Sequence, residues 1–428
     1  MKEKTATKRT AQIVLLITSI VLYGFMMAAK QIFSAELVEI IDVFNTTASQ
    51  ASLANLFYYI TYAVMQVLLV LFIEKVNIKG YLTITMAFSA IATLLIGIVG
   101  NLGASIYHLF VIFAVNGVLQ AGCYAGLVRI YNKYLDKDLY YQGIKLFPIS
   151  QLVSMILVYG MASIFVDVSI ARWDLPFIII GILFLIVVIA FFAVLTITAP
   201  KIQKQRGEIQ KTIKNEIKDV KVVHSKKVSR NLFLHMSIIC VIAFLYCAIY
   251  YAINNWFSNL LYDVYAVPKS YSILITVAVS SLALISGTVT ITIFEHINKV
   301  YLFSVIAALI GSAFGIILVF VYNVNVILAT ACCIVQIVTV RAAGMLSSGA
   351  MAYTLREVIA PSKYALLTNA CASTAAGAAP TVISLVFENF GWAVSFLVMA
   401  ILSIVLMALA ILAKFTEKKL FRSLYENN

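Results

Sequence analysis

Two basic residues lie where a charge can act directly on a solute. Lys30 lies deep inside an apolar stretch at residues 11–44, and Arg341 lies deep inside another at 325–355. A charge at that depth in a bilayer costs several kcal/mol unless it faces water, a partner or a ligand. The 18 acidic residues all lie in tails, in loops or near the ends of stretches, so none pairs with these cations at depth. We predict that Lys30 and Arg341 bind an anion from opposite sides.

A structural role is the alternative for both cations, because each could donate hydrogen bonds to helix carbonyls or to neighbouring polar groups. Polar residues also recur at helical spacing in several apolar stretches, which is typical of helices that line a hydrated path. Bonding between helices selects similar residues, so packing remains an alternative for each of them. The predicted substrate-binding set is Lys30, Tyr62, Asn116, Gln120, Tyr250, Asn254 and Arg341.

The elements that hold these residues must be membrane helices. The 428 residues are 63% hydrophobic and 11% charged, which is more apolar surface than one soluble core can bury. A helix needs about 20 apolar residues to cross a bilayer, and the chain has about twelve such stretches. They lie at 11–44, 51–73, 80–100, 105–129, 143–166, 174–198, 231–262, 269–294, 299–322, 325–355, 362–386 and 390–413.

The twelve stretches predict an all-α membrane protein with two pseudo-symmetric six-helix bundles. The expected order is an N-tail (1–10), an N-terminal bundle (11–198), a basic linker (199–230), a C-terminal bundle (231–413) and a C-tail (414–428). The linker carries isoleucines at helical spacing among many basic residues, which predicts an amphipathic helix on the membrane surface.

Basic residues lie almost entirely on one side of the predicted membrane. Of the 31 Lys and Arg residues, all but Lys30, Arg172, Lys269 and Arg341 fall in the tails or in the loops on the side of the termini. The positive-inside rule therefore predicts a multi-pass protein of the plasma (inner) membrane with both termini cytoplasmic. This distribution indicates contact with the lipid bilayer and not with nucleic acid. The 6 cysteines and 4 histidines show no ligand spacing, so no metal or other cofactor is expected.

A short acidic and basic turn occurs at equivalent places in the two halves. Residues 72–82 read FIEKVNIKGYL after the second stretch, and residues 293–303 read IFEHINKVYLF after the eighth. The equal spacing indicates an internal duplication. We expect the charged residues of these turns, together with an Arg at the end of the fourth stretch, to act in gates: Glu74, Lys75, Lys79, Arg129 and Glu295.

Two six-helix halves, a basic central segment and this repeated turn resemble the major facilitator superfamily. Its loop motif has a Gly, an acid and then spaced basic residues; Glu74, Lys75 and Lys79 match it, while Val70 stands in place of the Gly. The resemblance implies a cavity between the halves, lined mainly by helices 1, 4, 7 and 10, and rocking of the halves about it.

Within that superfamily the chain resembles the organophosphate:inorganic-phosphate antiporters and related organic-anion permeases. The segment GVLQAGCYAGLVRI (117–130) keeps their spacing of Gly, Gln and Arg, residues 355–370 resemble their turn into span 11, and Lys30 takes the place of a phosphate-binding Arg. The chain departs from the family at two places: no Arg lies near Tyr250, where the second phosphate-binding Arg is expected, and 143–166 contains no His.

The predicted function is secondary active transport of a small organic anion, such as a phosphorylated or carboxylated metabolite, by a monomer. Exchange of one anion for another fits the buried positive pair better than proton symport, for which Glu36 and Glu39 are the nearest carboxylates. A neutral or zwitterionic solute (sugar, nucleoside or drug) is the first alternative, and a non-transporting sensor of the same fold is the second. An enzyme is not expected, because no phosphate-binding loop, HExxH pair or buried acid–base cluster occurs.

Overall fold

The computed structural model describes residues 2–73, 75–167, 172–213, 226–294, 300–345, 355, 359 and 361–425. Twelve helical segments within these ranges are long and apolar enough to cross a membrane. The prediction of an all-α protein with twelve membrane helices is therefore confirmed.

The helices follow one another with short connections. In chain order they are α1 (Lys2–Ala35), α2 (Leu37–Val43), α3 (Ala48–Phe72), α4 (Ile78–Asn101), α5 (Ile106–Gln120), α6 (Cys123–Tyr134), α7 (Lys137–Asp167), α8 (Asp174–Ile213), α9 (Lys226–Tyr265), α10 (Lys269–Phe294), α11 (Val300–Val321), α12 (Val326–Met345), α14 (Pro361–Phe390) and α15 (Trp392–Tyr425). The fourth span, residues 106–134, consists of α5 and α6 with a break between them.

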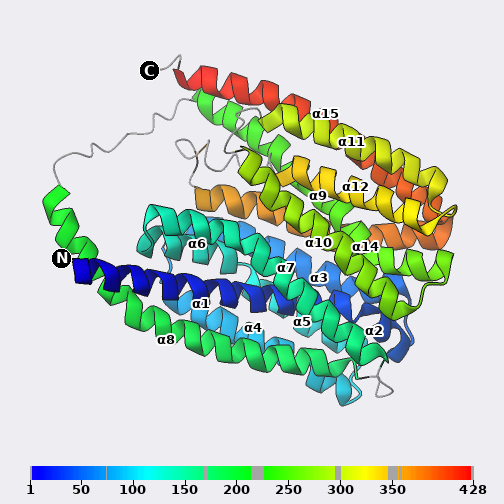
Figure 1. Cartoon of the computed structure of the whole chain (residues 1–428), viewed down its shortest axis with the longest axis horizontal. Coiled ribbons are helices and arrows are strands. Elements are labelled where there is room, and N and C mark those ends of the chain that lie inside the picture. The colour runs from blue at the N-terminus through cyan, green and yellow to red at the C-terminus, as the bar shows by residue number, and fades with distance from the viewer. Residues whose placement is uncertain are drawn as a thin grey trace.

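The helices pack as two groups that follow the halves of the chain (Figure 1). In the N-terminal half α1 packs on α7 and α8, α4 on α8, and α3 on α5. In the C-terminal half α9 packs on α14 and α15, and α11 on α12 and α15. Both chain ends lie at one end of the bundle, here called the terminal face, and the opposite end is the distal face (Figure 1).

The two halves meet along a seam in which α3 lies against α14 and α7 against α10. The described hydrogen bonds across this seam include two near the distal face: the Ser52 hydroxyl bonds to Thr381 at 3.2 Å, and Glu388 accepts from the Ser49 amide at 3.2 Å. At Gly377 on α14 an added Cβ would come 2.8 Å from the Cβ of Tyr59. The absence of a side chain at Gly377 therefore lets the helices approach closely, and the seam is closed near the distal face.

Local sequence signals fix where two helices of the seam and site begin. Thr47 and Gln50 form a capping box at the start of α3, with each side chain accepting from the other residue's backbone amide. The Asn325 side chain accepts from the amides of Ile327 and Leu328 at the start of α12. These caps set the starts of the helices that carry Tyr62 and Arg341.

The basic linker differs in part from the predicted surface helix. α8 continues through Pro200 to Ile213, so the first part of the linker is an extension of the sixth span and not a separate helix. A proline is tolerated there because neighbouring groups can satisfy the carbonyl that loses its partner. Residues 214–225 lie outside the described residues.

Candidate functional site

Lys30 on α1 lies against the faces of three tyrosines. Its Nζ is 4.2 Å from the ring centroid of Tyr62, 4.7 Å from that of Tyr59 and 5.9 Å from that of Tyr58. All three rings come from α3, and the Lys30 side chain is 94% buried, with 6% of its surface exposed. The negative faces of the rings attract the ammonium group, which stabilises a charge that would otherwise be desolvated.

Arg341 has the same kind of environment in the other half. Its guanidinium carbon is 4.3 Å from the ring centroid of Tyr250 on α9. Arg341 is 8% exposed, and its Nε is buried without a hydrogen-bond partner among the described residues. A donor that is buried and unpaired costs about 1–3 kcal/mol, and more if it is charged. Arg341 therefore has a buried donor, Nε, that no described residue satisfies.

A bridge of aromatic rings connects the two cations across the seam. The Tyr250 ring lies 5.0 Å from the Tyr251 ring, and Tyr251 lies 5.7 Å from Tyr59, which contacts Lys30. The Cys247 thiol interacts electrostatically with both Lys30 and Arg341. The structure thus connects the two cations that the sequence singled out, one from each half, through a series of ring contacts.

No carboxylate among the described residues forms an ion pair with Lys30 or Arg341. Cation–π contacts contribute about 2 kcal/mol each when desolvated. Removing an ion from water costs several kcal/mol even after the protein relaxes. The rings stabilise the two charges but do not neutralise them, so the described residues leave the site with an excess of positive charge.

Tyr62 also joins the site to α14, because the Asn369 amide donates to its hydroxyl at 3.5 Å. Tyr62 is thus the predicted binding residue that contacts both Lys30 and the opposite half. Both tyrosines of the predicted set, Tyr62 and Tyr250, lie against a cation.

Gln120 and Asn116 occupy a different position from that of the cations. They form a buried network with α4, in which Gln120 donates to Ser89 at 2.9 Å and Asn116 donates to Thr93 at 3.1 Å. The Tyr58 hydroxyl donates to the Gln120 oxygen at 2.5 Å, which links this network to Lys30 through the Tyr58 ring. Their polar groups are satisfied within the N-terminal half, so in this conformation they hold Tyr58 in place.

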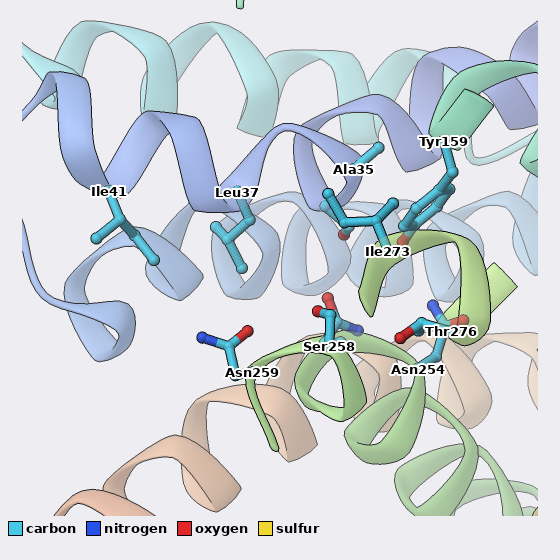
Figure 2. A pocket seen from close by; sticks show the side chains of 11 residues that line it. Ala35, Leu37, Ile41, Tyr159, Asn254, Ser258, Asn259, Ile273 and Thr276 are labelled. Carbon is cyan, nitrogen blue, oxygen red and sulfur yellow. The ribbon is translucent and has the colours of Figure 1, made fainter. Parts of the chain in front are cut away.

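Asn254 lies between the central cations and the distal face. Its side-chain oxygen accepts from Ser280, and it lines a pocket in the seam, here called the seam pocket (Figure 2). This pocket is walled by α1 and α2 on one side and by α9 and α10 on the other, with Tyr159 from α7. Its residues are Ser34, Ala35, Leu37, Ile41, Tyr159, Asn254, Asn255, Ser258, Asn259, Ile273 and Thr276.

The predicted gating residues cluster at the terminal face as far as they are described. Arg129 on α6 donates to the carbonyls of Ile73 and Val76, the latter at 2.9 Å, and so fixes the turn between α3 and α4. Lys79 lies 4.9 Å from the ring centroid of Phe192 on α8. The Lys75 amide bonds to the Phe72 carbonyl in the same turn, and Glu74 and Glu295 lie outside the described residues.

The predicted set lacks three tyrosines that contact Lys30 or belong to the ring bridge: Tyr58, Tyr59 and Tyr251. Each belongs to a Tyr-Tyr pair, at 58–59 and 250–251, one in each half. Adjacent helix residues point about 100° apart, so a selection at helical spacing keeps at most one ring of each pair. A doubled tyrosine inside one apolar stretch of each half was the available signal.

Comparison with known proteins agrees with this architecture. Two solved structures of a bacterial homolog of the human lysosomal transporter Spinster, inward-facing unoccupied and inward-facing occupied, share the fold. The first is 12% identical, with a TM-score of 0.71, and covers 95% of this chain and 97% of its own. The second is 13% identical, with a TM-score of 0.67, and covers 94% and 96%. No curated protein sequence matches this chain.

The sequence profile of the Major Facilitator Superfamily matches residues 14–365, which is most of the chain. The match includes both cations, the seam helices α3, α7 and α10, and the turn that Arg129 binds. This match confirms the prediction that the protein is a transporter and not an enzyme. The chain is a member of the Major Facilitator Superfamily of membrane transporters.

Proposed function

We propose that this transporter carries a small organic anion, which binds between Lys30 and Arg341. The observation that supports this best is the pair of buried cations, one from each half, joined by tyrosine rings and lacking a carboxylate partner among the described residues. The hydroxyls and cations around this point are donors, and an anion with several acceptor oxygens is the ligand that such groups recognise.

The position of Arg341 also bears on the organic-anion branch of the superfamily. In the antiporters that the sequence resembles, a second phosphate-binding Arg is expected near Tyr250, where this chain has none. Arg341 extends from α12 over the Tyr250 ring, 4.3 Å from its centroid, and so supplies a guanidinium beside that position. A carboxylate or phosphate group bound to Lys30 would therefore meet a second cation from the opposite half.

Transport would proceed by alternating access, with the halves rocking about the central site. The seam is closed near the distal face, so a solute in the site would leave when the terminal face opens. The charge distribution supports an orientation in which the terminal face lies in the cytoplasm, with the protein in the plasma (inner) membrane.

The excess positive charge of the empty site favours exchange of one anion for another over net transport of an anion in one direction. An empty site must carry two desolvated cations through the conformational change, whereas a bound anion neutralises them. We expect the loaded transporter to reorient faster than the empty one. An anion on one side would then exchange for an anion on the other, with the protein acting as a monomer.

The test is thermal unfolding of the purified protein with a panel of carboxylates, phosphate esters and neutral metabolites. A ligand at 100 times its dissociation constant stabilises the folded state by about 2.7 kcal/mol. An anion should stabilise the wild type and K133Q but neither K30Q nor R341Q. Lys133 is the matched control, because it lies 5.3 Å from the Tyr134 ring centroid, away from the site. Stabilisation by neutral compounds alone, or equal responses in all variants, would show that the solute is not an anion held by these cations.

A further inference from the structure

Tyr23 is a partly exposed ring on the inward side of α1. It lies seven residues before Lys30, so the two side chains share one face of the helix, about 10 Å apart along its axis. Ser19 and Met26 on that face are buried, whereas Tyr23 is only partly covered. The exposed residue Val21 points to the opposite side of the helix. The uncovered part of the Tyr23 ring therefore opens toward the interior of the protein and not toward lipid.

Electrostatic contacts place Tyr23 beside the cation site. Tyr23 interacts with Tyr62, which contacts Lys30, and with Tyr251, which brings the ring bridge from the other half. Along α1 it lies nearer than Lys30 to the terminal face (Figure 1). Because the seam is closed near the distal face, a solute bound to Lys30 has Tyr23 on its terminal side.

Two further rings form a wall with Tyr23, here called the aromatic wall. Phe147 of α7 lies 4.6 Å from Tyr23, and Tyr124 of α6 lies 5.1 Å from Phe147 and 6.3 Å from Tyr23, all between ring centroids. Phe147 is buried between the other two. Tyr124 is partly exposed, although its neighbours Cys123 and Ala125 are buried. Two tyrosine rings on a buried support thus keep part of their surface uncovered.

The hydroxyl groups next to the aromatic wall are already paired. Ser19 donates to the Leu16 carbonyl and bonds to the Tyr131 hydroxyl, at 2.8 Å each. Ser150 donates to the Ile20 carbonyl at 2.9 Å. A solute part rich in hydroxyls would gain no hydrogen bonds from these two serines. A flat apolar ring suits the wall better, because aromatic pairs attract one another at edge-to-face and offset geometries.

We propose, resting on the anion site proposed above, that the aromatic wall is a specificity subsite and that the solute is an anion carrying a planar aromatic ring. The anionic group binds Lys30 and Arg341, and the ring packs on the uncovered surfaces of Tyr23 and Tyr124. A short spacer separates the two parts of the solute, because the wall begins about two turns of α1 away from Lys30. Arylalkanoates are the simplest members of this class.

The experiment compares acids that differ only in the ring. Phenyl-substituted acids from benzoate to 4-phenylbutanoate, which lengthen the spacer one methylene at a time, are titrated in parallel with their cyclohexyl counterparts. Isothermal titration of the purified full chain gives the dissociation constants. Each pair shares its carboxylate and its spacer, so a difference within the pair reports the shape of the ring. The wild type should bind the best phenyl acid about two- to tenfold more tightly than its cyclohexyl counterpart.

The variants identify the rings that give this preference. Y23L and Y124L should lose it but still bind the cyclohexyl acids, because both cations remain. Y23F keeps the ring and should keep the preference. Y107L is the matched control, because Tyr107 is 67% exposed and pairs with Phe110 at 5.8 Å, away from the site.

Three outcomes separate this subsite from the anion site. Equal affinity for phenyl and cyclohexyl acids at every spacer length would overturn the aromatic subsite and leave the anion site standing. A preference that both Y23L and Y124L retain would do the same. A wild type that binds none of these acids, whatever the spacer, would overturn the anion site and the subsite with it.

Discussion

At the scale of single residues, the molecule handles its buried charges in two ways. Lys30 and Arg341 are surrounded by tyrosine faces, which stabilise a positive charge and leave its donors available. Glu36 has only acids as charged neighbours and no donor among the described residues, so it favours the neutral form. The first arrangement suits the binding of an anion, and the second suits a neutral carboxyl group.

We predict that the Tyr62 ring, more than its hydroxyl, supports anion binding. Y62L removes the ring face nearest Lys30, and we expect about thirtyfold weaker anion binding, which corresponds to the loss of one desolvated cation–π contact of about 2 kcal/mol. Y62F keeps the ring and should bind within about threefold of the wild type, since only the long bond from Asn369 is lost. Isothermal titration of both variants with the stabilising anion checks this. Equal losses in Y62L and Y62F would argue against a role for the ring face.

Glu36 also predicts how stability depends on pH. Burial and the neighbouring acids Glu39 and Asp174 raise its pKa in the folded protein from the ordinary 4.5 to about 8, so the folded state binds the proton more tightly than the unfolded state. The stabilisation is complete below pH 4.5 and is lost as pH rises through 8. The unfolding temperature of the wild type should therefore fall relative to that of E36Q between those values. A constant difference between the two proteins across that pH range would contradict this assignment.

At the scale of elements, the polar residues of α4 and α5 form an internal support for the site. Ser89, Asn116 and Gln120 bond to one another, and Gln120 accepts from Tyr58 beside Lys30. The sequence located these polar residues correctly, but helical spacing does not reveal whether a stripe faces the cavity or a neighbouring helix. That choice depends on how α4 packs against α5, which is a property of the assembled bundle.

Loss of this support should reduce stability measurably. Q120L leaves the buried Tyr58 hydroxyl without its bond to Gln120, which we expect to cost about 1–3 kcal/mol, while Ser89 and Asn116 keep their bond to each other. Adding Y58F removes the unpaired hydroxyl, so the double variant should lose less than the sum of the two single variants. Thermal unfolding of the three variants measures both effects. Strict additivity would show that Gln120 does not act on Tyr58.

The contact between α3 and α14 gives a second prediction at this scale. A side chain at Gly377 would collide with Tyr59, so G377A should push α3 and α14 apart. Spin labels at L102C and V324C, in distal loops of the two halves, should then show longer distances by pulsed dipolar spectroscopy. Gly160 on α7 is the matched control, because a Cβ added there would have no neighbouring atom within 4 Å. G160A should leave the distance distribution unchanged. Unchanged distances in G377A would show that this approach does not control closure.

At the scale of the whole molecule, hydropathy was sufficient to predict the twelve spans because each must cross the same thickness of lipid. Charge at depth was sufficient to find Lys30 and Arg341, since few alternatives exist for a cation there. The break between α5 and α6, the continuation of α8 to Ile213 and the partners of Gln120 were not predictable. They depend on contacts between segments far apart in the chain, and no local pattern records those contacts.

The proposed anion exchange requires that a cation from each half bind one anion during transport. The most direct measurement is uptake of the labelled stabilising anion into proteoliposomes loaded with the same anion or with buffer alone. We predict rapid uptake by the wild type and K133Q only when anion is present inside, and a loss of at least about tenfold in K30Q and in R341Q. Uptake that is unchanged in either cation variant would contradict the two-sided anion site, and equal uptake into empty vesicles would contradict exchange.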